Sequence, residues 1–290
     1  QIVGGVNRFT SYYSWSQRSD EEITELNQWC GRSILLTEGG RQVTDIAVFY
    51  PVESCWARYL PSRLWANDAP EVLGISGSYH AVGESLWRGA RDFTYIDSQA
   101  VTDSVVGNMG LEHPCGLSWR LIVLPSTDTL PLEVWNQLEW FVERGGLLIA
   151  AGSLPQNSSF EYPSQRVQDI SSRLFGEAPL PFKARFNRAG GAAVYLPQGM
   201  ESMVSAVADA LLERDFTPSQ KDSPLRVTHR SFPDRELYYV FNDSKQPCEE
   251  EVSFAAIGNA RMWDPQSGEI TELDYAPSYT VRLEGWSAVA

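Results

Sequence analysis

Carboxyl, aromatic and amide side chains gather near the start of the chain. Asp20, Glu21 and Glu22 are consecutive acids, and two carboxyl groups about 5–10 Å apart can act as acid and base, or acid and nucleophile, at one bond. Acids also favour the first turn of a helix, where they face the positive end of the helix dipole. We interpret these three as a helix start, and no pair of carboxyl groups in the sequence is assigned as catalytic.

Cysteine and serine residues elsewhere in the sequence do not lie in motifs typical of catalytic nucleophiles or metal ligands. The four cysteines are scattered, with no CxxC and no histidine at zinc-ligand spacing; they are Cys30, Cys55, Cys115 and Cys248. We expect buried free thiols, with a Cys55–Cys115 disulfide as the alternative. Ser126 and Ser153 follow apolar runs without a G-x-S-x-G motif. The sequence therefore predicts no catalytic residue, no metal ligand and no cofactor site.

The segment around the acids predicts a strand followed by a helix. Val3–Ser14 is interpreted as a strand that runs into an aromatic loop. Asp20 is the expected N-cap, and apolar residues recur at helical spacing until Gly39-Gly40 ends the helix. Another strand is expected at once, over 46–52. Forty residues are too few for a separate domain, so we expect the chain to be the tail of a larger protein that lacks its natural N-terminus.

Strands and helices then alternate. Apolar runs at 46–52, 93–96, 120–125, 147–151 and 191–196 predict buried strands, and helices are expected at 54–60, 79–89, 131–144 and 200–213. The helix at 131–144 begins with Pro131, ends before Gly145-Gly146, and places five apolar residues on one face, namely Val134, Trp135, Leu138, Phe141 and Val142. This α/β pattern predicts a flavodoxin-like three-layer domain with a parallel sheet. Flavin binding is the alternative that rests on fold analogy alone.

After Pro218 the pattern changes to short strands separated by turns, which predicts a small antiparallel β-sandwich. The strands are expected at 225–231, 236–242, 250–254, 260–263, 269–273 and 279–283. His229 is interpreted as a packed residue. The turns at 242–244 and 264–268 are interpreted as structural, with sugar or Ca²⁺ as the alternative ligands.

The composition and net charge argue against two classes of binding partner, nucleic acids and membranes. The chain has 290 residues, 43% of them hydrophobic, and a formal net charge of −14. Nucleic acid and anionic membrane surfaces need a basic patch, which no segment supplies. No apolar run is long enough to predict a transmembrane helix. Localisation stays open.

Several sequence blocks then carry a resemblance to a known family. They are GVNRFTSYYSW near the start, DIAVFYP at 45–51, YID at 95–97, LIVLPSTDTLP at 121–131, GGLLIAAG at 145–152, ELYYVFNDS at 236–244 and MWDPQSGEI at 262–270. In this order they resemble the C-terminal half of family 106-type α-L-rhamnosidases. A histidine that related sequences often carry after the GVN strand is replaced here by Tyr12.

The resemblance implies a division into three parts. Residues 1–40 would be the last βα unit of a (β/α)₈ barrel, 41–220 a class I amidotransferase-like α/β domain, and 221–290 the β-sandwich. The α/β domain is expected to be structural, because neither of two strand ends, at 121–124 and 147–152, offers a cysteine nucleophile.

The resemblance also implies a function. The chain would be an accessory part of a glycoside hydrolase acting on O-glycosidic bonds of carbohydrates, inactive alone, with its catalytic carboxylates mostly upstream. Ca²⁺ in the full-length enzyme and homo-oligomers stay open. Substrate contacts are expected from residues at a barrel mouth, where aromatic faces stack on sugars; these are Asn7, Thr10, Tyr12, Tyr13 and Trp15. Packing between domains is the alternative role of the aromatic ones. The alternative function is a non-catalytic oligomerisation or glycan-binding module.

Overall fold

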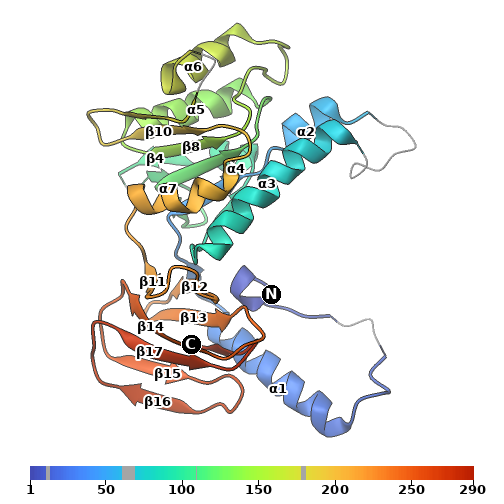
Figure 1. The fold of residues 1–290 in the computed structure, drawn as a ribbon, viewed down its shortest axis with the longest axis vertical. Helices are drawn as coiled ribbons and strands as arrows, with labels where there is room; N and C mark the ends of the chain where they lie inside the picture. Colours follow the sequence, from blue (N-terminus) through green and yellow to red (C-terminus); the bar gives the residue numbers. More distant parts are fainter. Residues whose placement is uncertain (11–13, 61–68, 109, 178–180) are drawn as a thin grey trace. The chain divides into compact units, whose positions relative to one another are not determined.

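The computed structural model describes residues 1–10, 14–60, 69–108, 110–177 and 181–290, which form two compact units. The sandwich unit consists of Gln1–Val43, Arg88–Asp92 and Arg214–Ala290. The parallel-sheet unit consists of Thr44–Trp87 and Phe93–Glu213. Figure 1 shows the elements of both units along the chain.

A six-stranded sheet forms the centre of the parallel-sheet unit. Its order is β3-β2-β7-β8-β10-β9, and all neighbours are parallel except β9, which is antiparallel to β10. The strands are β2 (Ile46–Phe49), β3 (Thr94–Ile96), β7 (Leu121–Pro125), β8 (Leu147–Ala151), β9 (Lys183–Phe186) and β10 (Ala192–Leu196). Counted along the chain, the parallel strands lie in the order 2-1-3-4-5, the order of flavodoxin-like sheets.

Helices cover both faces of this sheet, because alternate strand residues point to opposite sides. Ile46 and Val48 share one core with α3 (Pro70–Arg88) and α7 (Val204–Leu211). Ala47 and Phe49 share the other core with α4 (Ser98–Asp103), α5 (Leu132–Glu143) and α6 (Gln165–Phe175). A short helix, α2 (Val52–Arg58), follows β2, and the 3₁₀ turn η3 (Glu201–Met203) precedes α7. The three layers agree with the sequence-based expectation.

The spacing of apolar residues predicted those elements of the parallel-sheet unit that bury one apolar face. All five residues expected on the inner face of α5 are buried. Helix α3 is longer than expected and begins at Pro70. The small sheet of β4 (Val105–Gly107), β5 (Gly110–Glu112) and β6 (Ser118–Trp119) was not predicted. Its strands have two or three residues, too few to show an alternating pattern.

The sandwich unit contains two antiparallel sheets around one apolar core. One sheet has the order β1-β12-β13-β18 and the other β11-β14-β17, and β15 and β16 form a separate hairpin. The strands are β1 (Arg41–Gln42), β11 (Phe216–Pro218), β12 (Leu225–Ser231), β13 (Glu236–Asn242), β14 (Cys248–Phe254), β15 (Ala260–Trp263), β16 (Ile270–Leu273), β17 (Tyr279–Leu283) and β18 (Ala288–Val289). Val227 and Val240 of the first sheet pack with Val252 and Val281 of the second.

The N-terminal segment differs from the expectation. Helix α1 (Asp20–Thr37) is present, but its N-cap is Ser19, which forms a capping box with Glu22. The strand expected over Val3–Ser14 is wrong for the described residues: Ile2–Gly4 form a 3₁₀ turn, η1, and residues 5–10 have no regular structure. A strand needs backbone hydrogen bonds to a neighbouring strand; η1 lies beside β12 and β13, but none of the described residues 2–10 pairs with them as a strand.

Residues 1–43 are not a separate part in this structure, since they group with the C-terminal strands. The Arg32 guanidinium donates to the Gln266 carbonyl at 2.6 Å, and the Tyr239 hydroxyl bonds the Ser33 hydroxyl at 3.2 Å. These contacts join α1 to the sandwich, whereas the sequence placed a boundary at about residue 40. Sequence periodicity cannot show such contacts, because the partners are more than 200 residues apart.

Candidate functional site

The residues expected to contact substrate lie in the irregular N-terminal segment. Asn7, Thr10 and Trp15 are exposed to solvent. Tyr12 and Tyr13 lie outside the described residues. The three described side chains line no cavity that the structure describes, so their role in substrate contact remains a prediction.

The acids at the start of α1 act as helix caps. The Glu22 carboxylate accepts from the Ser19 backbone N–H at 2.9 Å, and this hydrogen bond lowers the pKa of Glu22. The Glu21 carboxyl also has a lowered pKa, first through a hydrogen bond to its own backbone. A catalytic acid needs the opposite shift. The capping interpretation of Asp20–Glu22 is therefore confirmed for Glu22.

A buried polar cluster fills the crevice between the ends of β2 and β7. In doubly wound sheets the crevice at this reversal of strand order is the usual ligand site. Here the Ser54 hydroxyl donates to the Thr129 carbonyl at 3.0 Å and accepts from the backbone N–H groups of Asp128 and Thr129. Arg58 pairs with the Asp128 carboxylate, and the Asn157 amide donates to the Asp128 carbonyl at 3.2 Å. The protein's own groups thus satisfy each other at this position.

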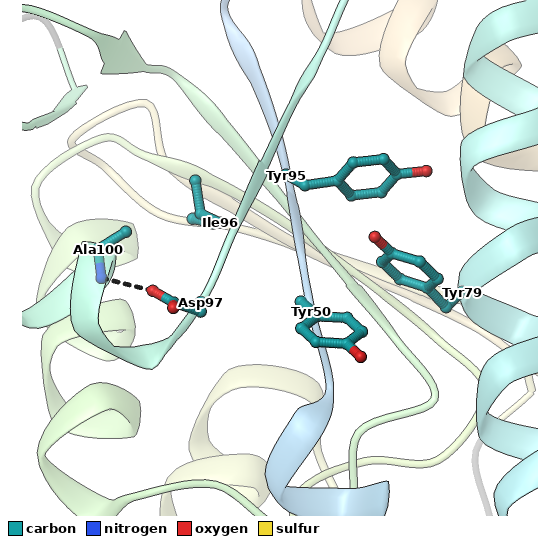
Figure 2. A pocket seen from close by; sticks show the side chains of 6 residues that line it. All are labelled: Tyr50, Tyr79, Tyr95, Ile96, Asp97 and Ala100. Atoms are coloured by element: carbon teal, nitrogen blue, oxygen red, sulfur yellow. Dashed lines mark hydrogen bonds between the residues drawn. The ribbon is translucent and has the colours of Figure 1, made fainter. Parts of the chain in front are cut away.

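An open pocket lies one strand away, at the ends of β2 and β3. It has a volume of about 330 Å³ and is lined by Tyr50, Tyr79, Tyr95, Ile96, Asp97 and Ala100. Figure 2 shows the three tyrosines on one side and the start of α4, with Asp97 and Ala100, on the other. Tyr50 directly follows β2, Tyr95 lies in the neighbouring strand β3, and Tyr79 lies in α3. Aromatic walls with a few polar groups are typical of ligand sites.

The tyrosine rings contact one another and form a continuous surface. The centroids of Tyr79 and Tyr95 are 4.7 Å apart, and those of Tyr50 and Tyr79 are 5.3 Å apart. Tyr50 and Tyr95 remain nearly half exposed, at 45% and 47%. Burial, the charge of Tyr95 and a hydrogen bond to Tyr95 raise the pKa of Tyr79, and burial raises that of Tyr95. The phenols of Tyr79 and Tyr95 are therefore neutral at physiological pH.

Two carboxylates lie at the same strand ends. Asp97 caps α4 by accepting from the Ala100 N–H at 2.8 Å through Oδ1, as the dashed line in Figure 2 shows. The neighbouring Ser98 hydroxyl donates to Oε1 of Glu53. Oε2 of Glu53 is buried, with no hydrogen-bond partner among the described residues. This end of the sheet is therefore electronegative.

The sequence interpretation did not select these residues as a site. Tyr50 and Tyr95–Asp97 belong to the blocks DIAVFYP and YID, but they were used there only as marks of resemblance. Aromatic and acidic residues at the C-terminal ends of the strands predicted at 46–52 and 93–96 were a usable signal, because the ends of parallel strands meet at one edge. Tyr79 could not be predicted as a site residue, since nothing in the sequence indicates which residue of a helix faces which strand.

The sandwich unit holds a second group of aromatic and acidic side chains around His229. Its ring nitrogens lie 2.8 Å from Asp215 Oδ2 and 2.9 Å from Glu236 Oε2. The Tyr238 ring stacks on the imidazole at a centroid distance of 4.0 Å, and its hydroxyl donates to Asp215 at 2.8 Å. Burial alone lowers the pKa of His229, but the two carboxylates outweigh it, so the pKa is raised. His229 is packed, as expected, and every polar group named here has a partner.

The remaining candidates are structural. The four cysteines are free thiols, as expected, but the expected burial is wrong: three are half-buried and Cys115 is exposed. In the expected turns, Asn242 donates to the Glu284 carbonyl at 3.0 Å, and Asp264 accepts from the Gln266 N–H at 2.8 Å. Among the described residues no three His, Cys, Asp or Glu side chains could hold a metal ion together. None of the described helices has the length and apolar character needed to cross a membrane.

Comparison with known proteins decides the family. The sequence model of glycoside hydrolase family 106, described as α-L-rhamnosidase, matches residues 3–277. The chain belongs to this family. The resemblance seen in the sequence blocks is confirmed.

Individual relatives are distant and longer. A solved rhamnosidase from Novosphingobium sp. PP1Y is 19% identical with a TM-score of 0.62, over 93% of this chain and 24% of that one. A family 42 β-galactosidase, Gan42B of G. stearothermophilus, is 12% identical with a TM-score of 0.62, over 95% of this chain and 45% of that one. A protein of Formosa agariphila named "Putative beta-glucuronidase" is 23% identical over 86% of this chain and 19% of its own length. The chain thus spans less than half of each of these proteins.

Proposed function

We propose that this chain is the accessory C-terminal part of an α-L-rhamnosidase-like glycoside hydrolase, whose catalytic carboxylates lie mostly outside these 290 residues. The observation that carries the proposal is the match to family 106 over residues 3–277, together with the coverage of only 24% of the related rhamnosidase. A longer enzyme has room for a catalytic domain in the remainder.

The carboxyl groups of the described residues support the proposal. A glycosidase acid must be protonated near neutral pH, which requires a raised pKa. The carboxyl groups whose pKa is displaced here all have it lowered, namely those of Glu21, Glu22, Glu161, Glu249 and Asp264. Asp128, Asp215 and Glu236 are engaged with Arg58 or His229.

The N-terminal helix supports a role for residues 1–40 as the last βα unit of a barrel. Leu26 and Leu35 of α1 are 42% and 67% exposed, although both are large apolar side chains. Further barrel elements would cover them, and would offer strand partners to the described residues 5–10, which have no regular structure here. In that setting Asn7, Thr10 and Trp15, with Tyr12 and Tyr13, would lie near a barrel mouth and contact the sugar.

An amidotransferase-like but non-catalytic role of the parallel-sheet unit is part of the same proposal. Ser126, rather than a cysteine, follows β7, and its hydroxyl accepts from the Ser153 N–H at 3.1 Å. Cys55 lies within α2, not at the elbow between a strand and a helix. The unit therefore offers no thiol nucleophile at these positions.

Hydrolysis assays on two proteins test the proposal. The 290-residue chain and a version extended at its N-terminus by a complete barrel are incubated with p-nitrophenyl α-L-rhamnoside, β-D-galactoside and β-D-glucuronide. We expect p-nitrophenol release by the extended protein alone. Release by the 290-residue chain would overturn the accessory role, and inactivity of the extended protein on all three substrates would overturn the hydrolase function.

A further inference from the structure

The aromatic pocket of the parallel-sheet unit resembles a preformed ligand site, because its tyrosines are held at fixed positions around an open space. Tyr50 directly follows β2, Tyr95 lies in β3 and Tyr79 in α3, so three separate parts of the unit converge to form one wall. The Tyr50 N–H donates to the Ile96 carbonyl at 2.7 Å, which continues the pairing of β2 and β3 up to the pocket. The rings of Tyr50 and Tyr95 are thereby held at fixed positions on neighbouring backbones, while their faces remain partly open.

Gly83 makes room for this wall. It lies in α3 one turn after Tyr79, and a Cβ atom there would come within 2.4 Å of the Tyr95 hydroxyl. Glycine inside a helix costs about 1 kcal/mol relative to alanine. The cost is offset by the space that lets the Tyr95 ring approach α3 and join Tyr79.

The polar groups beside the wall are hydrogen-bond acceptors and donors that the protein leaves unused. Oδ2 of Asp97 and the Tyr50 hydroxyl have no hydrogen-bond partner among the described residues. A neutral molecule with several hydroxyl groups could donate to the carboxylate and bond the phenol, while its C–H face packs on a ring. The arrangement contrasts with the crevice at Ser54, where neighbouring groups already satisfy one another.

The charge of the pocket disfavours anionic ligands. A phosphate or flavin phosphate would face the Asp97 carboxylate, with no cation among the pocket-lining residues. An alkylammonium ion would use the same open ring faces, and the experiment below therefore includes choline as a competing ligand. A volume of about 330 Å³ lies at the lower end of ligand pockets, which span about 300–1,000 Å³, and suits one small ring.

We propose that the pocket formed by Tyr50, Tyr79, Tyr95 and Asp97 binds a single neutral sugar residue of a glycan. The sugar packs a C–H face on the exposed tyrosine surface, and its hydroxyls donate to Asp97 Oδ2. An acidic sugar is disfavoured by the Asp97 carboxylate, which lines the pocket. This inference does not rest on the position of the catalytic carboxylates, because it concerns binding alone.

The test is ligand binding by the 290-residue chain. Saturation-transfer NMR and titration calorimetry are run with methyl α-L-rhamnoside, methyl β-D-galactoside and methyl β-D-glucuronide, and with choline and flavin mononucleotide as competing classes. We expect binding of at least one neutral glycoside, no binding of the glucuronide, and none of choline or the flavin. Tyr50→Ala and Tyr95→Ala should each weaken the binding about tenfold, through loss of ring contact.

Asp97→Asn should weaken it about fivefold, because its amide oxygen still caps α4 but the charged acceptor is lost. Trp140→Ala is the matched control, since Trp140 is 47% exposed and lies outside the pocket; it should bind normally. Heteronuclear NMR spectra verify that each variant is folded. The proposal is overturned by no binding of either neutral glycoside, by equal binding in the tyrosine variants, or by preferential binding of the glucuronide, choline or the flavin. None of these outcomes requires hydrolysis, so the result is separate from that of the hydrolysis assay.

Discussion

Two groups of tyrosine and acidic side chains in this protein contain similar residues but differ in how far their polar groups are hydrogen-bonded. Around His229 the imidazole, two carboxylates and the Tyr238 hydroxyl bond one another, and the histidine is 5% exposed. At the ends of β2 and β3 the tyrosines are nearly half exposed, and Asp97 retains an unused oxygen. A satisfied cluster contributes to stability and leaves nothing for a ligand, whereas an open one leaves groups available for binding.

The largest expected effect is on the closed cluster. His229→Ala removes the cation between Asp215 and Glu236 and leaves two nearby carboxylates that repel each other. We expect a loss of about 2–3 kcal/mol in the free energy of unfolding, below the usual cost for a fully buried pair because both carboxylates are partly exposed. Urea unfolding measures it. Glu249→Gln, in the exposed pair with Arg282, is the control and should change nothing measurable. An unaltered His229→Ala protein would show that the cluster does not stabilise the fold.

A smaller loss is expected at the closed crevice of the parallel-sheet unit. Ser54 is fully buried and makes three hydrogen bonds through one hydroxyl. Ser54→Ala leaves the Asp128 and Thr129 backbone groups without this partner, at a cost of about 1–3 kcal/mol. Sugar binding should persist, because Ser54 does not line the pocket. A large loss of binding with normal stability would instead place the ligand in the crevice.

The charge on His229 predicts a pH dependence. Its folded pKa is raised above the unfolded value of about 6.5. The stabilisation is therefore complete below the unfolded pKa and disappears as the pH rises through the folded pKa. We expect unfolding free energies of wild type and His229→Gln to converge across that interval, measured by urea titration from pH 5 to 9. Parallel pH profiles would contradict a protonated histidine in the folded state.

The smallest expected effects are those of alanine substitutions at two glycines of α3. One substitution should change the stability alone, and the other should change sugar binding. Gly77 has open space where a Cβ would be added, whereas at Gly83 the Cβ meets the Tyr95 hydroxyl. Gly77→Ala should stabilise the protein by about 0.5–1 kcal/mol and leave sugar binding unchanged. Gly83→Ala should displace the Tyr95 ring and weaken binding several-fold with little net change in stability. Thermal unfolding and calorimetry measure both variants, and equal binding by the two would contradict the role given to Gly83.

Sequence patterns were sufficient to predict those helices and strands whose apolar residues repeat with the period of the element. The five inner residues of α5, the buried run of β2 and the paired strands β12 and β13 follow from local spacing, because apolar side chains repeat with the period of the element. The strand expected at 3–14 is wrong over its described residues 3–10, since a strand depends on pairing with a neighbour as well as on its own residues.

The family, the acidic character and the α/β pattern followed by a sandwich were determined by the sequence itself, since they reside in residue order and composition. Tertiary structure alone decided that α1 packs with the sandwich, that Ser54 closes the crevice, and that Tyr50, Tyr79 and Tyr95 form one wall. Each of these depends on side chains from elements distant in the sequence. Their meeting is set by strand order and helix orientation, which local spacing does not encode.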